Sequence, residues 1–296
     1  MLMEEEARQR ADVAAYLRAV NAEEGLGLSP GLIAGLAEAA EGSFLAAVMY
    51  GQMLREHPER RAAWERDPGA IPRGLDGYLE SEWGRLQRAM RGAGMDRAAV
   101  EWALGLVAAL REPLSRQELE DLLRGVVDKD KGVAAGLEAL RGVLPGIARW
   151  LERAVEGRQT PMGWFHSRFR EFVAERLLWV SPQAVHRVLG VACDGWAELP
   201  AGSRARGYAV RHRLRHHWVA GAWAAGWRAA LEGGYQGERV RRGEGMGLVA
   251  DVEAGARAMG GEEGQDLEAV GVFVRRRVNR WGVGGRGRCG TSCGRC

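Results

Sequence analysis

The residues with the densest potential for chemistry lie between positions 204 and 217, where arginine and histidine recur. This run holds five arginines and three histidines, namely Arg204, Arg206, Arg211, Arg213, Arg215, His212, His216 and His217. On a helix, side chains four residues apart share a face, which places Arg211 beside Arg215 and His212 beside His216. Such a cluster could contact phosphate groups. The two histidines could also ligate a metal, but no third ligand is evident nearby.

The same run can be interpreted as the solvated face of a helix that packs through its apolar side. Tyr208, Leu214 and Trp218 would supply that side, while the arginine stems cover apolar surface and their charged ends stay in water. We favour this interpretation. From Ala201 onward the chain holds 17 Lys and Arg against 9 Asp and Glu, a balance of +8, so attraction of this basic third to nucleic acid stays open as the alternative.

A second group of candidate ligands is formed by three cysteines close to the C-terminus. Cys289, Cys293 and Cys296 have the spacing C-x3-C-x2-C. Structural zinc sites normally have four ligands, and no histidine lies in this stretch. Radical SAM enzymes use the same spacing inside a barrel, but the sequence has no alternation of strands and helices. We therefore expect no metal site. Cys193 stands alone in an apolar helical pattern, which is typical of a buried, reduced thiol.

The sequence lacks the motif that wraps the phosphates of a nucleotide. No G-x-x-x-x-G-K-[ST] occurs, so no loop offers backbone N–H groups and a lysine to phosphates. No acidic run follows an apolar strand to hold Mg²⁺. We therefore expect that this chain alone is not an enzyme and does not hydrolyse ATP.

Residues 1–95 favour short helices with brief connections. Apolar residues recur at helical spacing over residues 13–20. Ser29-Pro30 offers an N-cap followed by proline at the first helical position, and Gly42 breaks the helix that follows. Further helices are expected from Phe44 to about His57 and over residues 75–86. The fold class expected for the chain is mainly α, and this part would be a small helical lid and linker.

Residues 96–180 combine helices with a predicted hairpin. Amphipathic helices are expected over 100–110, after a capping box at Ser115-Arg116-Gln117-Glu118, and over 133–144 up to Pro145. Residues 147–151 alternate as a short strand does, and residues 162–165 would return as its partner after a turn at 157–161. A closing helix follows over 165–177. Three helices, a hairpin and a helix are the order of a winged-helix domain.

A winged helix that reads DNA needs a polar, basic outer face on its recognition helix. The helix predicted from Val133 to Leu144 offers one arginine and one glutamate. This surface is too apolar to read bases and is better suited to packing against protein. We therefore do not expect nucleic acid to be the partner, and a winged-helix nucleic-acid-binding protein is the alternative function.

The remaining chain is expected to be a helical arm over 181–260 and a poorly ordered tail over 261–296. From about Asn279 the tail has no apolar period, and it resembles GC-rich DNA translated in the wrong frame, so a truncated or frameshifted product is one expectation. The acidic start Met1-Leu2-Met3-Glu4 is unlike a signal peptide, and no apolar run could span a membrane. Cytoplasmic localisation without membrane attachment is therefore expected.

Several stretches resemble the STAND class of signal-transduction ATPases, in particular NACHT-type proteins associated with WD40 repeats. Glu41–Val48 looks like the "G-N-F-L-Y" helix of the family's lid, and Ile71–Leu79 is similar to its "L-P-x-G-L-x-x-x-Y" linker. Glu112–Ser115 and Phe165–Phe172 match its winged helix, and Tyr208–His217 resembles the "Y-x-L-R-Y-L-x-x-H-L" helix of its arm. These pieces stand in the family's order and cover roughly residues 10 to 260.

The resemblance implies a nucleotide-driven switch. His166, which taken alone is an ordinary capping or core histidine, matches the family histidine that contacts the β-phosphate of ADP. Gly42 and Phe44 match the lid that covers the nucleotide, although Ser43 stands where the family often has Asn or Pro. ADP or ATP would be bound only in a complete parent that carries the P-loop core. The expected partners are that ATPase core or a second copy, bound through the helical lid and arm.

Overall fold

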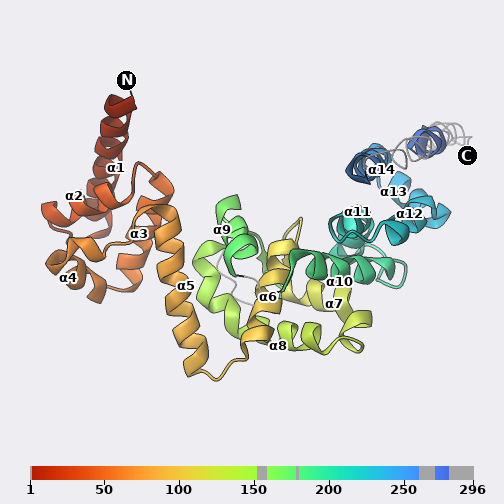
Figure 1. The fold of residues 1–296 in the computed structure, drawn as a ribbon, viewed down its shortest axis with the longest axis horizontal. Coiled ribbons are helices and arrows are strands. Elements are labelled where there is room, and N and C mark those ends of the chain that lie inside the picture. The colour runs from red at the N-terminus through yellow and green to blue at the C-terminus, as the bar shows by residue number, and fades with distance from the viewer. Residues whose placement is uncertain (1, 152–158, 178–179, 260–270, 280–296) are drawn as a thin grey trace, which may run out of the picture. The chain divides into compact units, whose positions relative to one another are not determined.

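A computed structural model describes residues 2–151, 159–177, 180–259 and 271–279 of the chain. The chain divides into two compact units, residues 1–94 and 95–296, and each unit is described here by itself (Figure 1). Helices make up most of the described residues, and the regular strands there form one two-stranded antiparallel sheet in the second unit. The prediction of a mainly α fold is confirmed.

The first unit consists of helices joined by short turns. Its elements are α1 (Leu2–Glu24), α2 (Pro30–Ala39), α3 (Phe44–Glu56), α4 (Glu59–Arg66), the 3₁₀ turn η1 (Pro68–Ala70) and α5 (Gly74–Gly92). Ser29 caps α2 by accepting a hydrogen bond from the backbone N–H of Leu32, and Ser43 caps α3 in the same way. The helices predicted to begin after Ser29 and at Phe44 are therefore confirmed.

Tyr50 lies at the centre of the first unit's core. Its ring is fully buried and meets the rings of Trp64 and Tyr78 edge to face. Its hydroxyl donates to the carbonyl of Pro72 at 2.5 Å. Through this one side chain, α3 is fastened both to α5 and to the segment that leads into α5.

The second unit begins with a helix, a short strand and two more helices. These are α6 (Arg97–Ala109), β1 (Leu114–Ser115), α7 (Arg116–Val127) and α8 (Lys131–Ile147), followed by the turn η2 (Ala148–Trp150), β2 (Pro161–Met162), α9 (Ser167–Phe172) and the wider helical turn η3 (Val173–Leu177). The capping box predicted at Ser115 is present, with Ser115 and Glu118 bonding to each other's backbone N–H. Helices α6 and α8 pack closely because Gly136 lets the backbone of α8 approach Trp102.

The hairpin predicted between residues 147–151 and 162–165 is present only as a short antiparallel contact, because residues 147–150 are helical and not a strand. Helix α8 continues through Pro145 to Ile147, and η2 takes up residues 148–150. Val143, Ile147 and Trp150 are all buried, so helical spacing, and not the alternation of a strand, decides this segment. Strand β2 pairs with β1 instead, and Leu151 contributes a single bridge to Trp164. The predicted turn at 157–161 falls partly outside the described residues.

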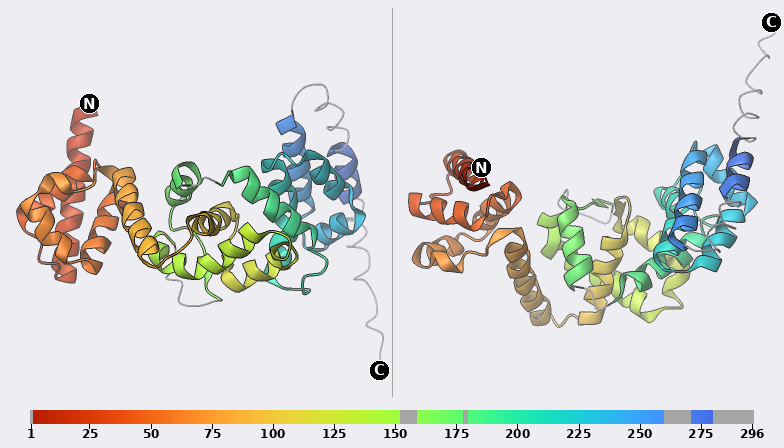
Figure 2. Two further views of the ribbon diagram at one scale, coloured as in Figure 1. Left: turned by 60° about the horizontal axis from the view of Figure 1, so that its bottom comes forward. Right: turned by 45° about the horizontal axis from the view of Figure 1, so that its top comes forward.

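The rest of the second unit is helical. It comprises α10 (Pro182–Asp194), α11 (Arg204–Val219), α12 (Trp223–Leu231), α13 (Gly233–Arg241), α14 (Gly245–Met259) and a helical stretch over 271–279. Helix α11 packs against α10, α12, α13 and α14, and the views in Figure 2 show these helices gathered together. It is therefore the element that holds this part of the unit together.

Residues 271–279 correct the expectation of a poorly ordered tail over 261–296. They form a helix whose Val274 and Val278, four residues apart, are both buried. The remainder of that predicted tail, residues 261–270 and 280–296, lies outside the described residues, and so do Cys289, Cys293 and Cys296. Among the helices that the structure describes, none combines the length and the apolar character that crossing a membrane requires.

Candidate functional site

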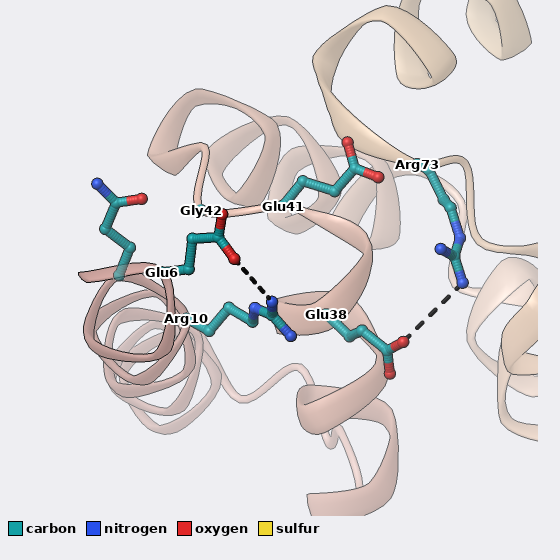
Figure 3. Close-up of a pocket in the computed structure, with 7 residues that line it drawn as sticks. Glu6, Arg10, Glu38, Glu41, Gly42 and Arg73 are labelled. Atoms are coloured by element: carbon teal, nitrogen blue, oxygen red, sulfur yellow. Dashed lines mark ion pairs between the residues drawn. The ribbon is translucent and has the colours of Figure 1, made fainter. Parts of the chain in front are cut away.

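Gly42, predicted to be a lid residue, lines a pocket of about 410 Å³ in the first unit (Figure 3). The pocket lies where α2 turns into α3. Glu41 and Gly42 both adopt left-handed backbone angles there, with φ of 51° and 80°. A β-carbon on residue 42 would stand 2.8 Å from the side-chain oxygen of Gln9, so α1 lies directly against this turn. The backbone angle favours glycine at this position.

Charged side chains line this pocket. Figure 3 shows Arg10 directed toward Glu6 and Arg73 toward Glu38, in ion pairs of 3.6 and 3.9 Å. Both pairs are largely exposed and contribute little to stability. With Glu41 the lining has three carboxylates against two guanidinium groups, which disfavours a phosphate group.

Phe44 does not share the pocket with Gly42. Its ring is 47% exposed and packs edge-on against Tyr16, with ring centroids 6.1 Å apart. The pocket has no aromatic or aliphatic wall on which a nucleobase could stack. The two predicted lid residues are therefore close in the chain, but they face different surroundings.

His166, predicted to contact a phosphate, lies in the second unit as the N-cap of α9. Its Nδ1 accepts a hydrogen bond from the backbone N–H of Arg168 at 3.1 Å, and its side chain is exposed. An imidazole that accepts at Nδ1 carries its ring proton on Nε2. Nε2 is therefore a donor that can reach an anion approaching from solvent.

The basic run 204–217 forms most of α11, and much of it is buried. The predicted apolar side is confirmed, since Tyr208, Leu214 and Trp218 are buried. The prediction that the arginines and histidines form a wet face is wrong for Arg213, His216 and His217, which are also buried. Carboxylates and ring nitrogens from other elements pair with these buried groups. The spacing of residues along one helix cannot predict such partners.

Glu112 connects the segment before β1 to α11. Its two carboxylate oxygens accept from Arg211 at 2.6 and 2.7 Å, and one of them lies 2.8 Å from Nε2 of His212. Burial alone would raise the pKa of Glu112, but the hydrogen bonds and charges of Arg211 and His212 hold it below its usual value. Glu112 therefore stays ionised and ties two segments about a hundred residues apart in the chain.

Asp194, at the end of α10, likewise joins its own helix to α11. It accepts from Arg213 at 2.7 Å and lies 3.0 Å from Nε2 of His217. Arg213 also donates to Glu232 at 2.6 Å. Sequence reasoning missed Glu112, Asp194 and Glu232 as partners, because nothing in their local pattern distinguishes them from solvent-exposed acids.

A buried chain of ring nitrogens and a hydroxyl runs between α10 and α11. Nδ1 of His186 lies 2.7 Å from Nδ1 of His216, and Nε2 of His216 lies 2.8 Å from the hydroxyl of Tyr208. Burial first, then the positive charges of Arg111 and Arg215, lower the pKa of His186 to about 4. Burial likewise holds the pKa of His216 well below its usual value. Both rings are therefore neutral near pH 7.

The proposed metal pair of His212 and His216 does not converge. His212 is directed to Glu112, whereas His216 contacts His186 and Tyr208. Within the described part of the chain, no group of three or more His, Cys, Asp or Glu side chains is placed to hold a metal ion. Cys193 is a buried free thiol, and burial raises its pKa above the usual range.

Comparison with protein-family models, with curated proteins and with solved structures finds no match to the chain. A functional interpretation therefore depends on the residues and on their arrangement. Three features are available for it: the polar pocket at Gly42, the exposed His166 beside the short sheet, and the buried pairing of α11 with the segment that precedes β1.

Proposed function

We propose that the chain is a non-catalytic regulatory part of a NACHT-type ATPase of the STAND class. Residues 1–95 would be its helical lid and linker, 96–180 its winged helix and 181–260 its helical arm. These parts would close over ADP and swing away when ATP replaces it. The observation that carries the proposal is the position of His166, exposed directly after the short sheet with its Nδ1 bonded to the backbone N–H of Arg168 and its Nε2 turned to no partner among the described residues.

The order of elements in the second unit supports the winged-helix assignment. Helix α6, strand β1, helices α7 and α8 and strand β2 follow one another, and Leu114 pairs with Met162. The bridge from Leu151 to Trp164 extends the pairing toward a third short strand. A helix, a strand, two helices and returning strands are the order of winged-helix domains.

The charges of the Gly42 pocket bear on which part of a nucleotide the lid would face. Three carboxylates line it, so a phosphate would be repelled there. We therefore assign the phosphate contact to His166 and none to the pocket at Gly42. The nucleotide itself would be held by the P-loop core of a complete parent, and the chain alone would not hydrolyse ATP.

Nucleic-acid binding by the basic C-terminal third remains the alternative function. The pairing of its cations weighs against it, since Arg211, Arg213 and Arg239 all form ion pairs with carboxylates. The exposed charges of α8 are Lys131, Glu138 and Arg141, which is little for reading a duplex. Retention on heparin or duplex DNA that falls steeply with added salt would support this alternative over the ATPase part.

A comparison of ADP release in two His166 variants tests the proposed function. The flanking DNA would first be translated in all frames to find a P-loop core, and the core would be expressed together with this chain. His166→Ala removes both the cap and the imidazole, whereas His166→Asn keeps a capping side chain and removes only the imidazole. We expect ADP to leave both variants faster than the parent by about tenfold, the worth of one charge-assisted hydrogen bond. Equal release rates in all three proteins would refute the role of His166.

A cytoplasmic protein that works with an ATPase core or with a second copy fits this proposal. Co-purification of the chain with a P-loop ATPase core would support the first partner. Self-association through the lid and arm would give a concentration-dependent mass in solution instead.

A further inference from the structure

A second cavity, of about 220 Å³, lies in the second unit beside α9. It is bounded by the segment that precedes β1, by the end of β2 and by one side of α9. The side chains of Arg111, Arg170 and Ser167 line it, together with Trp164 and Met162. His166 is not among its lining residues, so this cavity is distinct from the ADP contact proposed for that histidine.

Neither arginine in this cavity forms an ion pair with a residue that the structure describes. Nε of Arg111 is buried and has no hydrogen-bond partner. The neighbouring acid, Glu112, also borders the cavity, but its carboxylate is taken by Arg211 and His212. The two arginines that are buried in the described part of this unit, Arg213 and Arg239, both pair with carboxylates. An unpaired cation in a partly buried cavity is costly unless an anion neutralises it.

The charges around Arg111 also favour an anion in this cavity. Burial first, then the positive charges of Arg215 and Arg170, lower the pKa of the Arg111 guanidinium. Two cations, Arg111 and Arg170, thus border one small cavity, and their mutual repulsion is relieved when an anion enters. Nearby Arg168 differs, because it forms ion pairs with Glu171 and Glu175.

We propose that this cavity binds a phosphate group, held by Arg111 and Arg170 with the hydroxyl of Ser167 as a third donor. The two guanidinium groups come from different segments of the fold and match the two charges of a phosphate dianion. A tetrahedral anion accepts hydrogen bonds from several directions, so it can bind Arg111 on one wall and Ser167 and Arg170 on the wall formed by α9. The group belongs either to free inorganic phosphate or to a small phosphate ester such as a nucleotide.

Titration of the full chain with inorganic phosphate at about pH 8, where phosphate carries close to two charges, tests this site. Calorimetry or the ³¹P resonance would report binding. We expect saturable binding to one site, weakened about tenfold or more in Arg170→Gln. Arg168→Gln is the matched control, because it removes a cation from the same helix that does not line the cavity, and it should bind as the parent does. Arg111→Lys, which keeps the charge where the side chain is partly buried, should weaken binding by a smaller factor.

Absence of saturable phosphate binding, or binding that Arg170→Gln leaves unchanged, would overturn the proposal. A parallel titration with ADP separates the two sources of the phosphate group. ADP binding that Arg170→Gln weakens assigns the site to a phosphate ester, whereas binding of phosphate but not ADP assigns it to the free anion. The site does not depend on the proposed function, since loss of phosphate binding leaves the ADP release test of His166 unaffected.

Discussion

At the scale of single residues, the second unit is distinguished by polar side chains that are buried in pairs. His186, His216 and Tyr208 are all buried and form a row of short contacts. These three groups share two hydrogen bonds, which use two hydrogens. A proton added to either imidazole ring would leave a third hydrogen among them without an acceptor. Neutral rings are thus part of the folded state, and the stability of the unit depends on pH.

We predict that the second unit loses stability as the pH falls from about 6.5 toward 4. A histidine whose pKa is lowered by folding binds its proton preferentially in the unfolded chain, so its contribution is complete above 6.5 and is lost below it. For His186 alone the loss between pH 6.5 and about 5 is about 1.5 kcal/mol. Urea unfolding followed at several pH values would measure it. In His186→Gln the dependence should be shallower, and an unchanged slope would contradict the assignment.

Glu112 provides a second prediction at this scale. Glu112→Ala leaves Arg211 with only its 3.2 Å contact to Glu244 and leaves His212 without its acid, so we expect a loss of about 2–3 kcal/mol in the free energy of unfolding. Glu171→Ala is the control, because its pair with Arg168 is longer, at 3.5 Å, and Arg168 keeps its pair with Glu175, so it should cost less than about 1 kcal/mol. Chemical denaturation of both variants measures the difference. Similar losses would show that Glu112 is no more than a surface acid.

His166 should contribute little to stability, whatever its function. It is exposed and its structural role is the single capping bond to the N–H of Arg168, so His166→Ala should cost no more than about 1 kcal/mol. His166→Asn should cost less, since asparagine is a good N-cap. A loss of several kcal/mol in either variant would mean that the histidine is a core residue, and the ADP test could then not be interpreted.

At the scale of elements, the sequence predicted starts of helices better than their ends and partners. The caps predicted at Ser29 and Ser115 begin α2 and α7, and α3 begins at Phe44 as predicted, with Ser43 as its cap. Helix α4 has Trp64 as its single buried residue, so its hydrophobic pattern is too weak to predict the helix from the sequence. The partner of β2 depends on β1, 46 residues earlier, and local alternation contains no information about such a distant pairing.

For the candidate sites too, the sequence predicted local features but not the pairing of distant segments. His166 could be placed at the start of a helix from its neighbours, and Gly42 at a break, because both are local features. The pairing of Glu112 with α11 and the approach of Arg111 to Arg170 depend on segments that are far apart in the chain. The sequence offered no spacing rule that could join them.

Gly136 allows a prediction about the contact between α6 and α8. A β-carbon at this position would stand 2.6 Å from Cβ of Trp102 and 3.2 Å from the backbone nitrogen of Ala103, and this backbone cannot easily move away. Gly136→Ala should therefore destabilise the second unit by about 1–3 kcal/mol, although alanine favours helices. Gly125→Ala in α7 is the matched control, since its β-carbon meets nothing within 4 Å. It should be neutral or stabilise by up to about 1 kcal/mol, and equal effects at both positions would refute the close packing.

At the scale of the whole molecule, the chain has two compact units, and each has a core of its own. The first is built around Tyr50, Trp64 and Tyr78, and the second contains α6 to α14. Units with separate cores can unfold in separate steps. Tryptophan reports on both, because Trp64 and Trp83 belong to the first unit and the other nine of the chain's 11 tryptophans to the second.

We predict that each unit can be destabilised without the other. Tyr50→Phe removes the buried hydroxyl that donates to the carbonyl of Pro72 and should cost the first unit about 1–2 kcal/mol. Gly136→Ala should act only on the second unit. In thermal unfolding followed by calorimetry, each variant should lower one of two transitions and leave the other in place. If both variants lowered a single common transition, the two cores would unfold as one cooperative structure, and the prediction of independently stable units would be wrong.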